Sequence, residues 1–388
     1  VTNAGLIEGT TSRGLFIHGV PSLTNSGTIA ALGTGALVQI IGETVIGATT
    51  KALILASGNG AQVDLDNETI SGGTLKTSVG GTIAAQFGTL SGVTIAPSSL
   101  IEVNGSFSGG TIGAGAVVET GGGTALVFGT VSNGGTLFAK SASDGVVITP
   151  GAVVNGGVAL IGDGIVDIAG SSSESVRFLS NGNGGLEIAD APGQTSAFSG
   201  KVSGFGGVGH ANGLQFIDLA QVTFAFGSAI TSSYASANPA NTSGTLFISS
   251  GGQLVAAINF VGAYSAGNFL VGPPGIRPGI GGTVIRDPGV VDGGSVNTGA
   301  APPLDAHSGI DLPNIAFGAR TTLAYAQNGA GGGGTLMVTD GRHAAAFALL
   351  GNYMAGSFVA MTDGHGGTLI TEANPQQQQP LLTHPPHG

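Results

Sequence analysis

The heptapeptide VTNAGLI at residues 1–7 returns 22 residues later as LTNSGTI at residues 23–29. Both copies carry Thr-Asn, then a small residue and a glycine, and then the start of a strand-like run. A unit of roughly 20–25 residues with three short strands is about what one coil of a β-solenoid requires. Each coil buries its apolar stripe only against its neighbours, so several coils must stack to be stable.

A double glycine directly before a strand start continues this punctuation along the chain. It occurs in Gly72-Gly73-Thr74-Leu75, Gly109-Gly110-Thr111-Ile112, Gly134-Gly135-Thr136-Leu137, Gly156-Gly157-Val158 and Gly184-Gly185-Leu186. Runs such as residues 61–66 alternate apolar and polar side chains between these signals, which is typical of a half-buried strand. The pattern predicts an all-β chain in which residues 1–195 form a parallel β-helix or a related β-solenoid.

The composition supports this prediction. Glycine makes up 74 of 388 residues and charged residues only 8%, whereas hydrophobic residues make up 41%. Disordered chains are charged and poor in Val, Ile and Leu, so they are excluded, and collagen is excluded because no Gly-x-y period exists. Glycine supplies the positive φ angles of tight turns between many short strands.

The charge and the cysteine content exclude several classes of function. The net charge is −11 and the ten basic residues are scattered, so a nucleic-acid partner is not expected. The chain has no cysteine, which removes thiolate metal sites and cysteine nucleophiles. The sequence contains no run of 18 or more apolar residues, so no transmembrane helix is predicted. Because the chain opens at Val1 without a methionine or an apolar leader, we expect a fragment of a longer protein.

The second half of the chain contains one module twice. We predict a β module at residues 196–290 (module 1) and a related one at residues 310–372 (module 2). Matching landmarks are Ile217-Asp218-Leu219 and Ile310-Asp311-Leu312, Gly244-Thr245-Leu246 and Gly334-Thr335-Leu336, Gly262-Ala263-Tyr264 and Gly351-Asn352-Tyr353, and Gly281-Gly282-Thr283 and Gly366-Gly367-Thr368. The tyrosines pair as Tyr234 with Tyr325 and Tyr264 with Tyr353, and residues 253–260 and 341–350 are both expected to be strands.

Two segments are not expected to belong to either module. Residues 291–309 are rich in proline and glycine and are predicted to be a linker. Residues 373–388 contain Gln376–Gln379 followed by several prolines, a low-complexity composition that predicts a disordered tail.

The order of motifs in the modules resembles a known group of proteins. Phe-x-Gly-x-Val-x-Gly-Phe-Gly at residues 198–206, followed by the Ile-Asp-Leu, Gly-Thr-Leu, Gly-x-Tyr and Gly-Gly-Thr motifs, resembles the C-terminal region of large bacterial secreted β-strand-repeat proteins of autotransporter or adhesin type. Module 2 lacks the first of these motifs. The resemblance implies a secreted, extracellular protein of the bacterial cell surface. It also implies a structural or adhesive, non-catalytic role, with a host or surface polymer or other matrix proteins as partners.

An enzyme is the first alternative. Asp64 and Asp66 share one face of a strand and Glu68 lies two residues on, as in carbohydrate-active β-helix enzymes such as polysaccharide lyases and hydrolases. Lys76 is the nearest basic residue in the sequence. The competing interpretation, an exposed acidic stripe without catalytic function, is the one that we favour.

A calcium-binding surface repeat protein is the second alternative. Asp340-Gly341 and Asp363-Gly364 resemble the turns of calcium-binding β-rolls, but each occurs once, whereas such rolls need the motif in tandem. Asp218 and Asp311 are expected to face solvent or to cap a turn. The seven histidines, His18, His210, His307, His343, His365, His384 and His387, show no zinc-binding spacing. We therefore predict no catalytic, cofactor-binding or metal-ligating residue.

Overall fold

The computed structural model describes residues 1–42, 44–47, 49–189, 198–206, 215–222, 230–272, 282–287, 310–312, 315–318, 320–327, 333–340, 344–350, 358–362 and 367–372. This part of the chain is nearly all β, and its one described helix is the single 3-10 turn Ala266–Asn268. Residues Val1–Gly289 and Val290–Gly388 form two compact units. The all-β prediction is confirmed.

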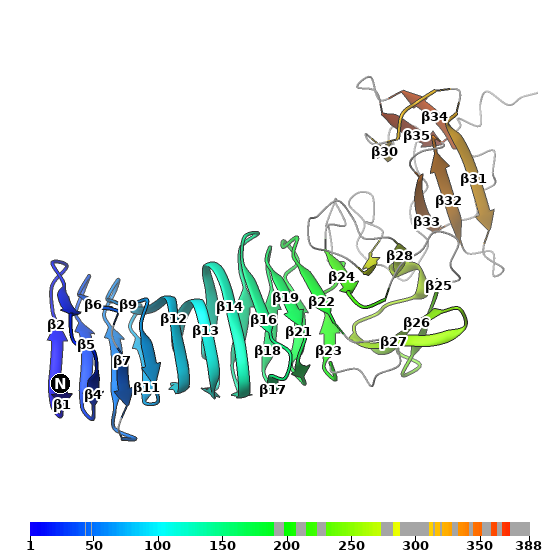
Figure 1. Ribbon diagram of the computed structural model, residues 1–388. Helices are drawn as coiled ribbons and strands as arrows, with labels where there is room; N and C mark the ends of the chain where they lie inside the picture. The colour runs from blue at the N-terminus through cyan, green and yellow to red at the C-terminus, as the bar shows by residue number, and fades with distance from the viewer. Residues whose placement is uncertain are drawn as a thin grey trace, which may run out of the picture. The chain divides into compact units, whose positions relative to one another are not determined.

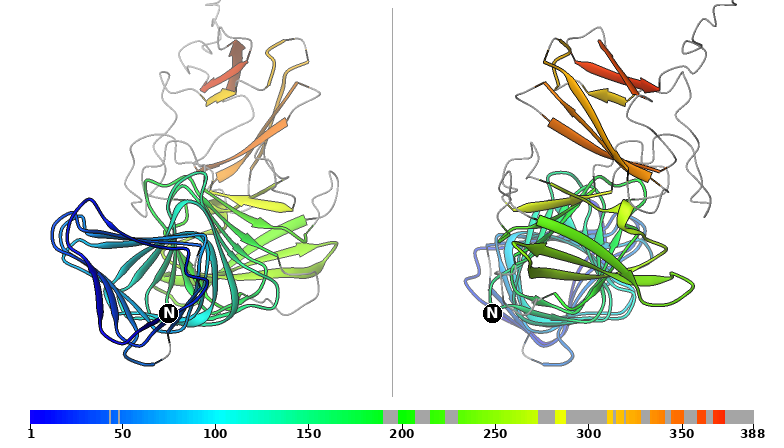
Figure 2. Two further views of the ribbon diagram at one scale, coloured as in Figure 1. Left: turned by 60° about the vertical axis from the view of Figure 1, so that its left-hand side comes forward. Right: turned by 90° about the vertical axis from the view of Figure 1, so that its right-hand side faces the viewer.

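The first unit is a parallel β-solenoid of about nine coils. Its coils follow one another from β1 toward β24 (Figure 1), and a view closer to the axis shows them overlying one another (Figure 2). Each coil contributes three strands, and each strand pairs in parallel with the equivalent strand of the next coil. The strands therefore form three columns, which are the three faces of the solenoid. The sequence prediction of a β-solenoid is therefore confirmed.

Each face is a column of strands. Face 1 contains β1 (Thr2–Asn3), β4 (Leu23–Asn25), β7 (Thr44–Gly47), β10 (Thr69–Ser71), β16 (Gly145–Ile148), β19 (Ile165–Ile168), β22 (Gly185–Ile188) and β24 (Phe216–Leu219). Face 2 contains β2 (Leu6–Gly9), β5 (Thr28–Leu32), β8 (Leu53–Ser57), β11 (Thr74–Ser78), β17 (Val153–Asn155) and β20 (Ser171–Ser172). Face 3 contains β3 (Leu15–His18), β6 (Leu37–Ile41), β9 (Gln62–Asp66), β15 (Thr136–Ala139), β18 (Val158–Ile161), β21 (Ser175–Phe178) and β23 (Lys201–Ser203). The long strands β12 (Thr82–Ile95), β13 (Leu100–Ile112) and β14 (Val117–Asn133) bend around the corners and contribute to all three faces.

The core consists of aliphatic columns that run through the coils. Alternate residues of a strand point to opposite sides, so every second side chain points inward. One column on face 1 is Leu23, Val45, Ile70, Leu90, Phe107, Val127, Ile148, Ile168, Ile188 and Leu219, none of which is more than 3% exposed. Each coil thus buries its apolar side chains directly on those of its neighbours.

The first repeat of the sequence forms one corner of the solenoid. Asn3 and Asn25 are paired in register and buried, and the Asn3 Nδ2 donates to Asn25 Oδ1 at 2.9 Å. The Asn3 Oδ1 accepts from the Gly5 N–H. A Cβ on Gly27 would lie only 2.1 Å from the Gly5 carbonyl oxygen, so glycine is required at this corner. The Thr-Asn-x-Gly repeat therefore encodes a stacked, hydrogen-bonded corner.

The Phe-x-Gly-x-Val-x-Gly-Phe-Gly motif forms the last coil. Its Phe198, Val202 and Phe205 are buried, and β23 at its centre pairs in parallel with β21. A Cβ on Gly200 would collide with the Glu174 carbonyl oxygen. The motif, which falls within the range predicted for module 1, is therefore the last coil of the solenoid, and from here on module 1 denotes the strands that follow it, beginning at residue 216.

Module 1 ends the parallel stack. Its strands after β24 are β25 (Ile230–Ser236), β26 (Ser243–Ser250), β27 (Gln253–Val261), β28 (Leu270–Gly272) and β29 (Thr283–Arg286). β27 extends face 3 by pairing in parallel with β23. On its other edge β27 pairs antiparallel with β26, which in turn pairs antiparallel with β25. On face 1, β24 pairs in parallel with β22 and antiparallel with β29. Module 1 is thus the cap of the solenoid on both of these faces.

An aromatic cluster closes the end of the core beneath this cap. Phe205 lies 5.2 Å from Phe178 between ring centroids, and Phe260 lies 4.8 Å from Phe269. The Tyr264 hydroxyl donates to the Phe205 carbonyl oxygen at 3.0 Å. Eleven of the 17 phenylalanines follow residue 197. Three of these, Phe205, Phe260 and Phe269, fill the space where no further coil follows.

Module 2 repeats the strand pairing of module 1. Its strands are β30 (Ile310–Leu312), β31 (Thr322–Gln327), β32 (Gly333–Thr339), β33 (Ala344–Leu350), β34 (Phe358–Thr362) and β35 (Thr368–Glu372). β30 pairs with β35 as β24 pairs with β29, β34 pairs with β35 as β28 pairs with β29, and β31–β32–β33 repeat β25–β26–β27.

The registers of the two modules are also the same. Leu219 is opposite Thr283, as Leu312 is opposite Thr368. The Thr283 hydroxyl donates to the Val222 carbonyl oxygen at 2.7 Å, and the Thr368 hydroxyl donates to the Ile315 carbonyl oxygen at 2.7 Å. Tyr234 and Tyr325 are opposite Leu246 and Leu336. The two modules therefore share their strand register and a threonine side-chain hydrogen bond as well as their sequence motifs.

Other parts of the predicted organisation lie where the structure gives no description. The predicted boundary at residue 195, the whole predicted linker at residues 291–309, the tail at residues 373–388 and Tyr353 are outside the described residues. The predicted strands at residues 253–260 and 341–350 correspond to β27 and to β33.

Candidate functional site

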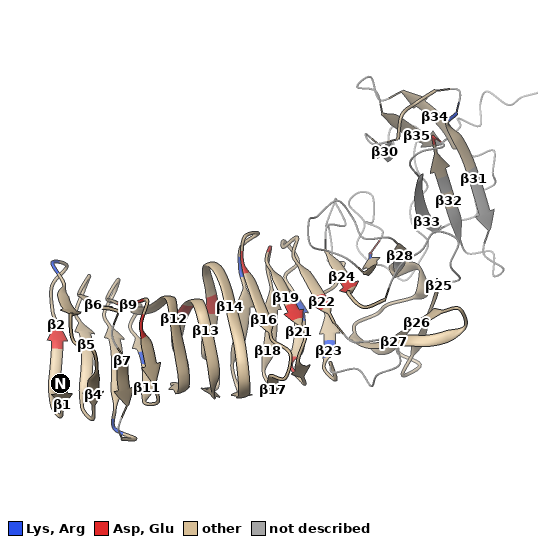
Figure 3. Ribbon diagram, in the orientation of Figure 1, with Lys and Arg blue, Asp and Glu red and all other residues tan. Residues whose placement is uncertain are grey.

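Charged residues are sparse on the solenoid (Figure 3), but some acidic residues align in two rows. The face-3 row consists of Asp64, Glu102 and Glu119, which occupy one outward column together with Ala84. The face-1 row consists of Asp167, Glu187 and Asp218, which occupy three successive strands in register. Neighbouring strands lie about 4.8 Å apart, so the carboxyl groups within the face-1 row are close neighbours.

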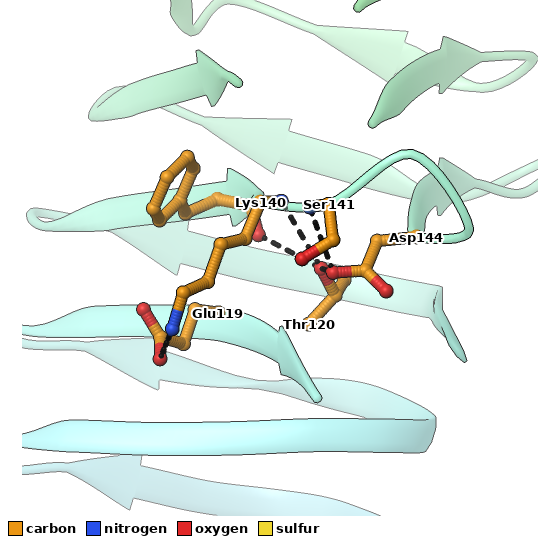
Figure 4. Close-up of polar contacts among 6 residues, drawn as sticks. Glu119, Thr120, Lys140, Ser141 and Asp144 are labelled. Atoms are coloured by element: carbon orange, nitrogen blue, oxygen red, sulfur yellow. Dashed lines mark hydrogen bonds and ion pairs between the residues drawn. The ribbon is translucent and has the colours of Figure 1, made fainter. Parts of the chain in front are cut away.

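The face-3 row is joined to one basic residue. Figure 4 shows the Lys140 Nζ beside Glu119, 2.9 Å from its Oε1. The hydrogen bond with Glu119 raises the pKa of Lys140, and burial followed by repulsion from Glu119 raises the pKa of Glu102. The Lys140 side chain is 50% exposed, so the ion pair contributes little to stability.

The adjacent corner is held by Asp144. Its Oδ2 accepts the Thr120 hydroxyl at 2.8 Å and the Ser141 N–H at 2.9 Å, and these contacts are visible in Figure 4. Asp144 is 4% exposed. Ser141 belongs to the same turn as Asp144, and Thr120 belongs to the coil before it. The Asp144 carboxylate therefore has a structural role, because it links this turn to the preceding coil.

The face-1 row carries the more perturbed carboxyl groups. Burial, then the charge of Asp167 and then that of Asp218 raise the pKa of Glu187 to about 7. Burial also raises the pKa of Asp167. Glu187 therefore exists in both protonation states near neutral pH, which is the property of a general acid or base.

A depression lies beside this row. Its volume is about 270 Å³. Its lining residues are Thr124, Ala142, Ser143, Asp144, Gly145, Val147, Ile165, Asp167 and Glu187. Two of the three carboxylates of the face-1 row thus border this depression, which is slightly smaller than the usual ligand pocket.

One guanidinium group adjoins the row at its other end. Arg286 lies on β29 opposite Phe216, two residues along β24 from Asp218, whose own register partner is Val284. Burial lowers the pKa of Arg286, and the charge of Asp218 acts in the opposite direction. The structure thus brings together three carboxyl groups and one guanidinium group on one face.

The acidic stripe predicted around residue 64 is only partly correct. Asp64 and Asp66 point outward, and Asp64 accepts from Gln39 Nε2 at 3.0 Å. Glu68 points inward and is 3% exposed, because Asn67 adopts a φ of 55° and turns the chain at the corner. Lys76 lies on face 2 and does not share a face with these carboxylates.

The prediction that Asp218 faces solvent or caps a turn is wrong. Its side chain is fully buried, on a strand that lies between β22 and β29. Asp311 lies on β30 at the equivalent register position, and its side chain is outside the described residues.

The candidate calcium turns and histidines are only partly described. Asp340 is 9% exposed and accepts the Ala316 N–H at 3.0 Å. Asp363 and all histidines except His18, which is exposed on β3, lie outside the described residues. Within the described segments, no group of three or more His, Asp or Glu side chains is arranged to hold a metal ion.

Asp167 and Glu187 were not singled out from the sequence, although a signal exists. Val166-Asp167-Ile168, Leu186-Glu187-Ile188 and Ile217-Asp218-Leu219 each place an acid between two aliphatic residues. In a solenoid such tripeptides put the acid outward and the aliphatic residues inward. Their spacings of 20 and 31 residues conceal the alignment.

Calcium is expected to leave the melting temperature unchanged, because Asp340 already accepts a backbone N–H and no described cluster can coordinate the ion. Circular dichroism melting with calcium and with a chelator measures this. A rise of many degrees would contradict the expectation, since a ligand that binds only the folded state stabilises it, and would reassign Asp340 and Asp363 as ligands.

Among the described residues, no helix has the length and the apolar character needed to cross a membrane. Comparison of the chain with family models, with curated proteins and with solved structures found no match.

Proposed function

We propose that the chain is a structural and adhesive part of a large secreted bacterial surface or matrix protein and has no catalytic role. The observation that carries the proposal is the uninterrupted parallel stack, in which the same inward positions are aliphatic in coil after coil. Such an architecture supplies a rigid spacer with a long lateral surface. The motif resemblance of residues 198–388 to secreted bacterial repeat proteins supports the same function.

The outer surface is consistent with this role. Charged residues make up 8% of the chain, and one outward column of face 2 consists of Thr28, Leu53, Thr74, Thr94, Thr111 and Ser132. A surface of this kind binds partners through hydrogen bonds and apolar contacts more than through charge. We therefore expect an uncharged surface polymer or another matrix protein as the partner.

The proposal is tested by localisation and by attachment. Antibodies against residues 1–206 are expected to label intact cells of the bacterium that produces the chain. Deletion of the coding region is expected to reduce attachment of the cells to their natural surface at least several-fold. Label confined to the cell interior, or attachment equal to that of the parent strain, would contradict the proposal.

A carbohydrate-active enzyme is the second candidate, and the face-1 row favours it. Asp167, Glu187 and Asp218 with Arg286 form the kind of cluster that an acid/base reaction on a sugar polymer requires. If this candidate is correct, the chain releases reducing ends or unsaturated products from a panel of neutral and acidic polysaccharides. Glu187→Gln then lowers that rate by at least 100-fold, while Glu8→Gln, a change of an exposed carboxylate, leaves it unchanged.

A further inference from the structure

Module 2 has the strand pairing of a cap but no described solenoid to cap. The pairings within module 1 all recur in module 2. Two further pairings of module 1 do not recur among the described residues. They are β24 with β22 and β27 with β23, which join module 1 to the last coil of the solenoid.

Those two pairings define the docking face of module 1. On face 3, Lys201, Val202 and Ser203 are opposite Asn259, Phe260 and Val261 in parallel register. On face 1, the strand Phe216–Leu219 follows Gly185–Ile188 residue by residue. The inward residues Val202 and Phe260 are buried at this junction. The face therefore combines two strand edges with an apolar core.

The equivalent edges of module 2 belong to β30 and β33. In the described part of the chain, β30 pairs only with β35, and β33 pairs only with β32. β33 has the sequence AAAFALL, with no charged residue and no proline. Edge strands that remain exposed in natural proteins are usually protected by charges, proline or bulges. An edge without such protection is suited to strand addition.

The sequence before module 2 does not repeat the motif that forms the coil beneath module 1. The Phe-x-Gly-x-Val-x-Gly-Phe-Gly motif that builds the last coil stands at residues 198–206 and does not recur before residue 310. Module 2 does retain the residues of a folded cap. Leu312, Ile315, Leu336, Val338, Phe358 and Ile370 are its buried core, and the threonine hydrogen bond is kept at Thr368.

We propose that module 2 is a second cap, which docks on the terminal coil of a parallel β-solenoid carried by another polypeptide. In the docked state, β30 and β33 add to two faces of that coil in the parallel register that β24 and β27 use. Backbone hydrogen bonds of the two edges provide the affinity, and the aliphatic inward residues of the coil provide the specificity. The partner is thus recognised as a solenoid end, with a strand like Lys201–Ser203 at its edge.

The solenoid end of this chain, once uncovered, serves as the probe. The acceptor carries Phe260→Asp to release module 1, Ala346→Pro to disable its own module 2, and Lys201→Cys. The donor is the full chain with Ala348→Cys, because Ala348 occupies the register position of Asn259, which is opposite Lys201. The chain has no cysteine of its own, so a mixed disulfide reports this register alone. The matched control donor carries Ala324→Cys on β31, away from the docking edge.

A disulfide-linked heterodimer with the Ala348→Cys donor, at least tenfold more abundant than with the control donor, is the expected result. A folded acceptor that gives no heterodimer overturns the proposal. Homodimers of the donor through Ala348→Cys also overturn it, because the occupant of the edge is then a second copy of module 2. Circular dichroism establishes that the acceptor is folded.

A second variant does not require an uncovered solenoid. In the shared register, β27 residues 256 and 257 correspond to β33 residues 345 and 346, and all four are alanine. The substitutions Ile258→Phe, Phe260→Leu and Val261→Leu therefore give β27 the edge sequence of β33. Combined with Lys201→Cys and Asn259→Cys, this chimera is expected to form the intramolecular disulfide to the same extent as the double-cysteine chain without the transplant. Loss of the disulfide, with or without loss of folding, shows that the β33 edge cannot dock and overturns the proposal.

Discussion

Replacing Phe260 by alanine is expected to lower the free energy of unfolding of the solenoid unit by about 3–5 kcal/mol, the usual loss for a fully buried phenylalanine. Phe260 is 1% exposed and continues the inward column of face 3 directly above Val202. Its ring also contacts Tyr264 and Phe269, at 5.1 and 4.8 Å between centroids. The substitution therefore opens a cavity on face 3, where the coil core meets its cap.

Urea unfolding followed by circular dichroism measures this effect. Phe87→Ala is the matched control, because Phe87 is 71% exposed and its removal is expected to change the free energy of unfolding by less than about 0.5 kcal/mol. Equal losses for the two variants would show that the aromatic cluster does not close the core. A reduced slope of the urea transition in Phe260→Ala would indicate that the cap unfolds separately from the coils.

The solenoid is expected to lose stability as the pH rises from 5 to 8, with the main contribution from Glu68. Burial, together with the charge of Asp66, raises the pKa of Glu68 from its ordinary 4.5 to about 8. Between these values the folded chain holds a proton that the unfolded chain releases, so unfolding becomes easier as the pH increases. At about 1.4 kcal/mol per pKa unit, the loss from this group is at most ~4 kcal/mol.

Glu174 acts in the same direction and with a smaller effect. It is fully buried, and burial raises its pKa to about 7 even though Asn133 Nδ2 donates to it at 2.6 Å. The stability attributable to this protonated carboxyl is complete below pH 4.5 and is lost as the pH passes 7.

The variant Glu68→Gln tests the source of the pH dependence. The amide has nearly the same shape and cannot ionise, so the variant is expected to be more stable than the parent at pH 8.5 and similar to it at pH 5. Glu8→Gln, on an exposed strand position, is the matched control and is expected to leave the profile unchanged. Parallel pH profiles of the parent and of Glu68→Gln would locate the effect elsewhere.

The coil of the solenoid was predictable because its local signals are strong. The two copies of the sequence repeat within residues 1–29 lie on neighbouring coils, where β1 pairs with β4 and β2 pairs with β5, each repeated residue opposite its counterpart. The double glycines were less informative than their regular appearance implied. Gly72-Gly73 turns from face 1 to face 2, Gly134-Gly135 from face 2 to face 3, and Gly184-Gly185 from face 3 to face 1. They mark corners, but not the same corner of each coil.

The candidate site was not predictable, for reasons of register. Asp167 and Glu187 become neighbours because their coils stack, and coil lengths vary with the loops at the corners. Leu23, Val45, Ile70, Leu90 and Phe107 occupy one column at separations of 22, 25, 20 and 17 residues. The inward direction of Glu68 depends on the positive φ of Asn67, which ordinary strand alternation does not anticipate. Long-range register decides the first outcome and a local corner conformation decides the second, and a single sequence specifies both of them weakly.

The duplicated module was predictable because its motifs coincide with paired positions. Ile-Asp-Leu and the last residue of Gly-Gly-Thr are opposite each other in both copies, and each tyrosine of the hairpin is opposite the leucine of Gly-Thr-Leu. Its role as a cap was not predictable, because that role depends on which strand edges meet the last coil.

The stacking of coils has a mechanical consequence. A load applied along the axis acts on the backbone hydrogen bonds between two coils, and a coil that detaches can unwind from the end while the remaining coils stay folded. A coil of roughly 20 residues adds only about 5 Å to the stack, yet its extended chain spans about 70 Å. Under tension the molecule would lengthen in discrete steps and dissipate work at each one. A tether of this kind would let an attached cell yield to a flow pulse without releasing its anchor.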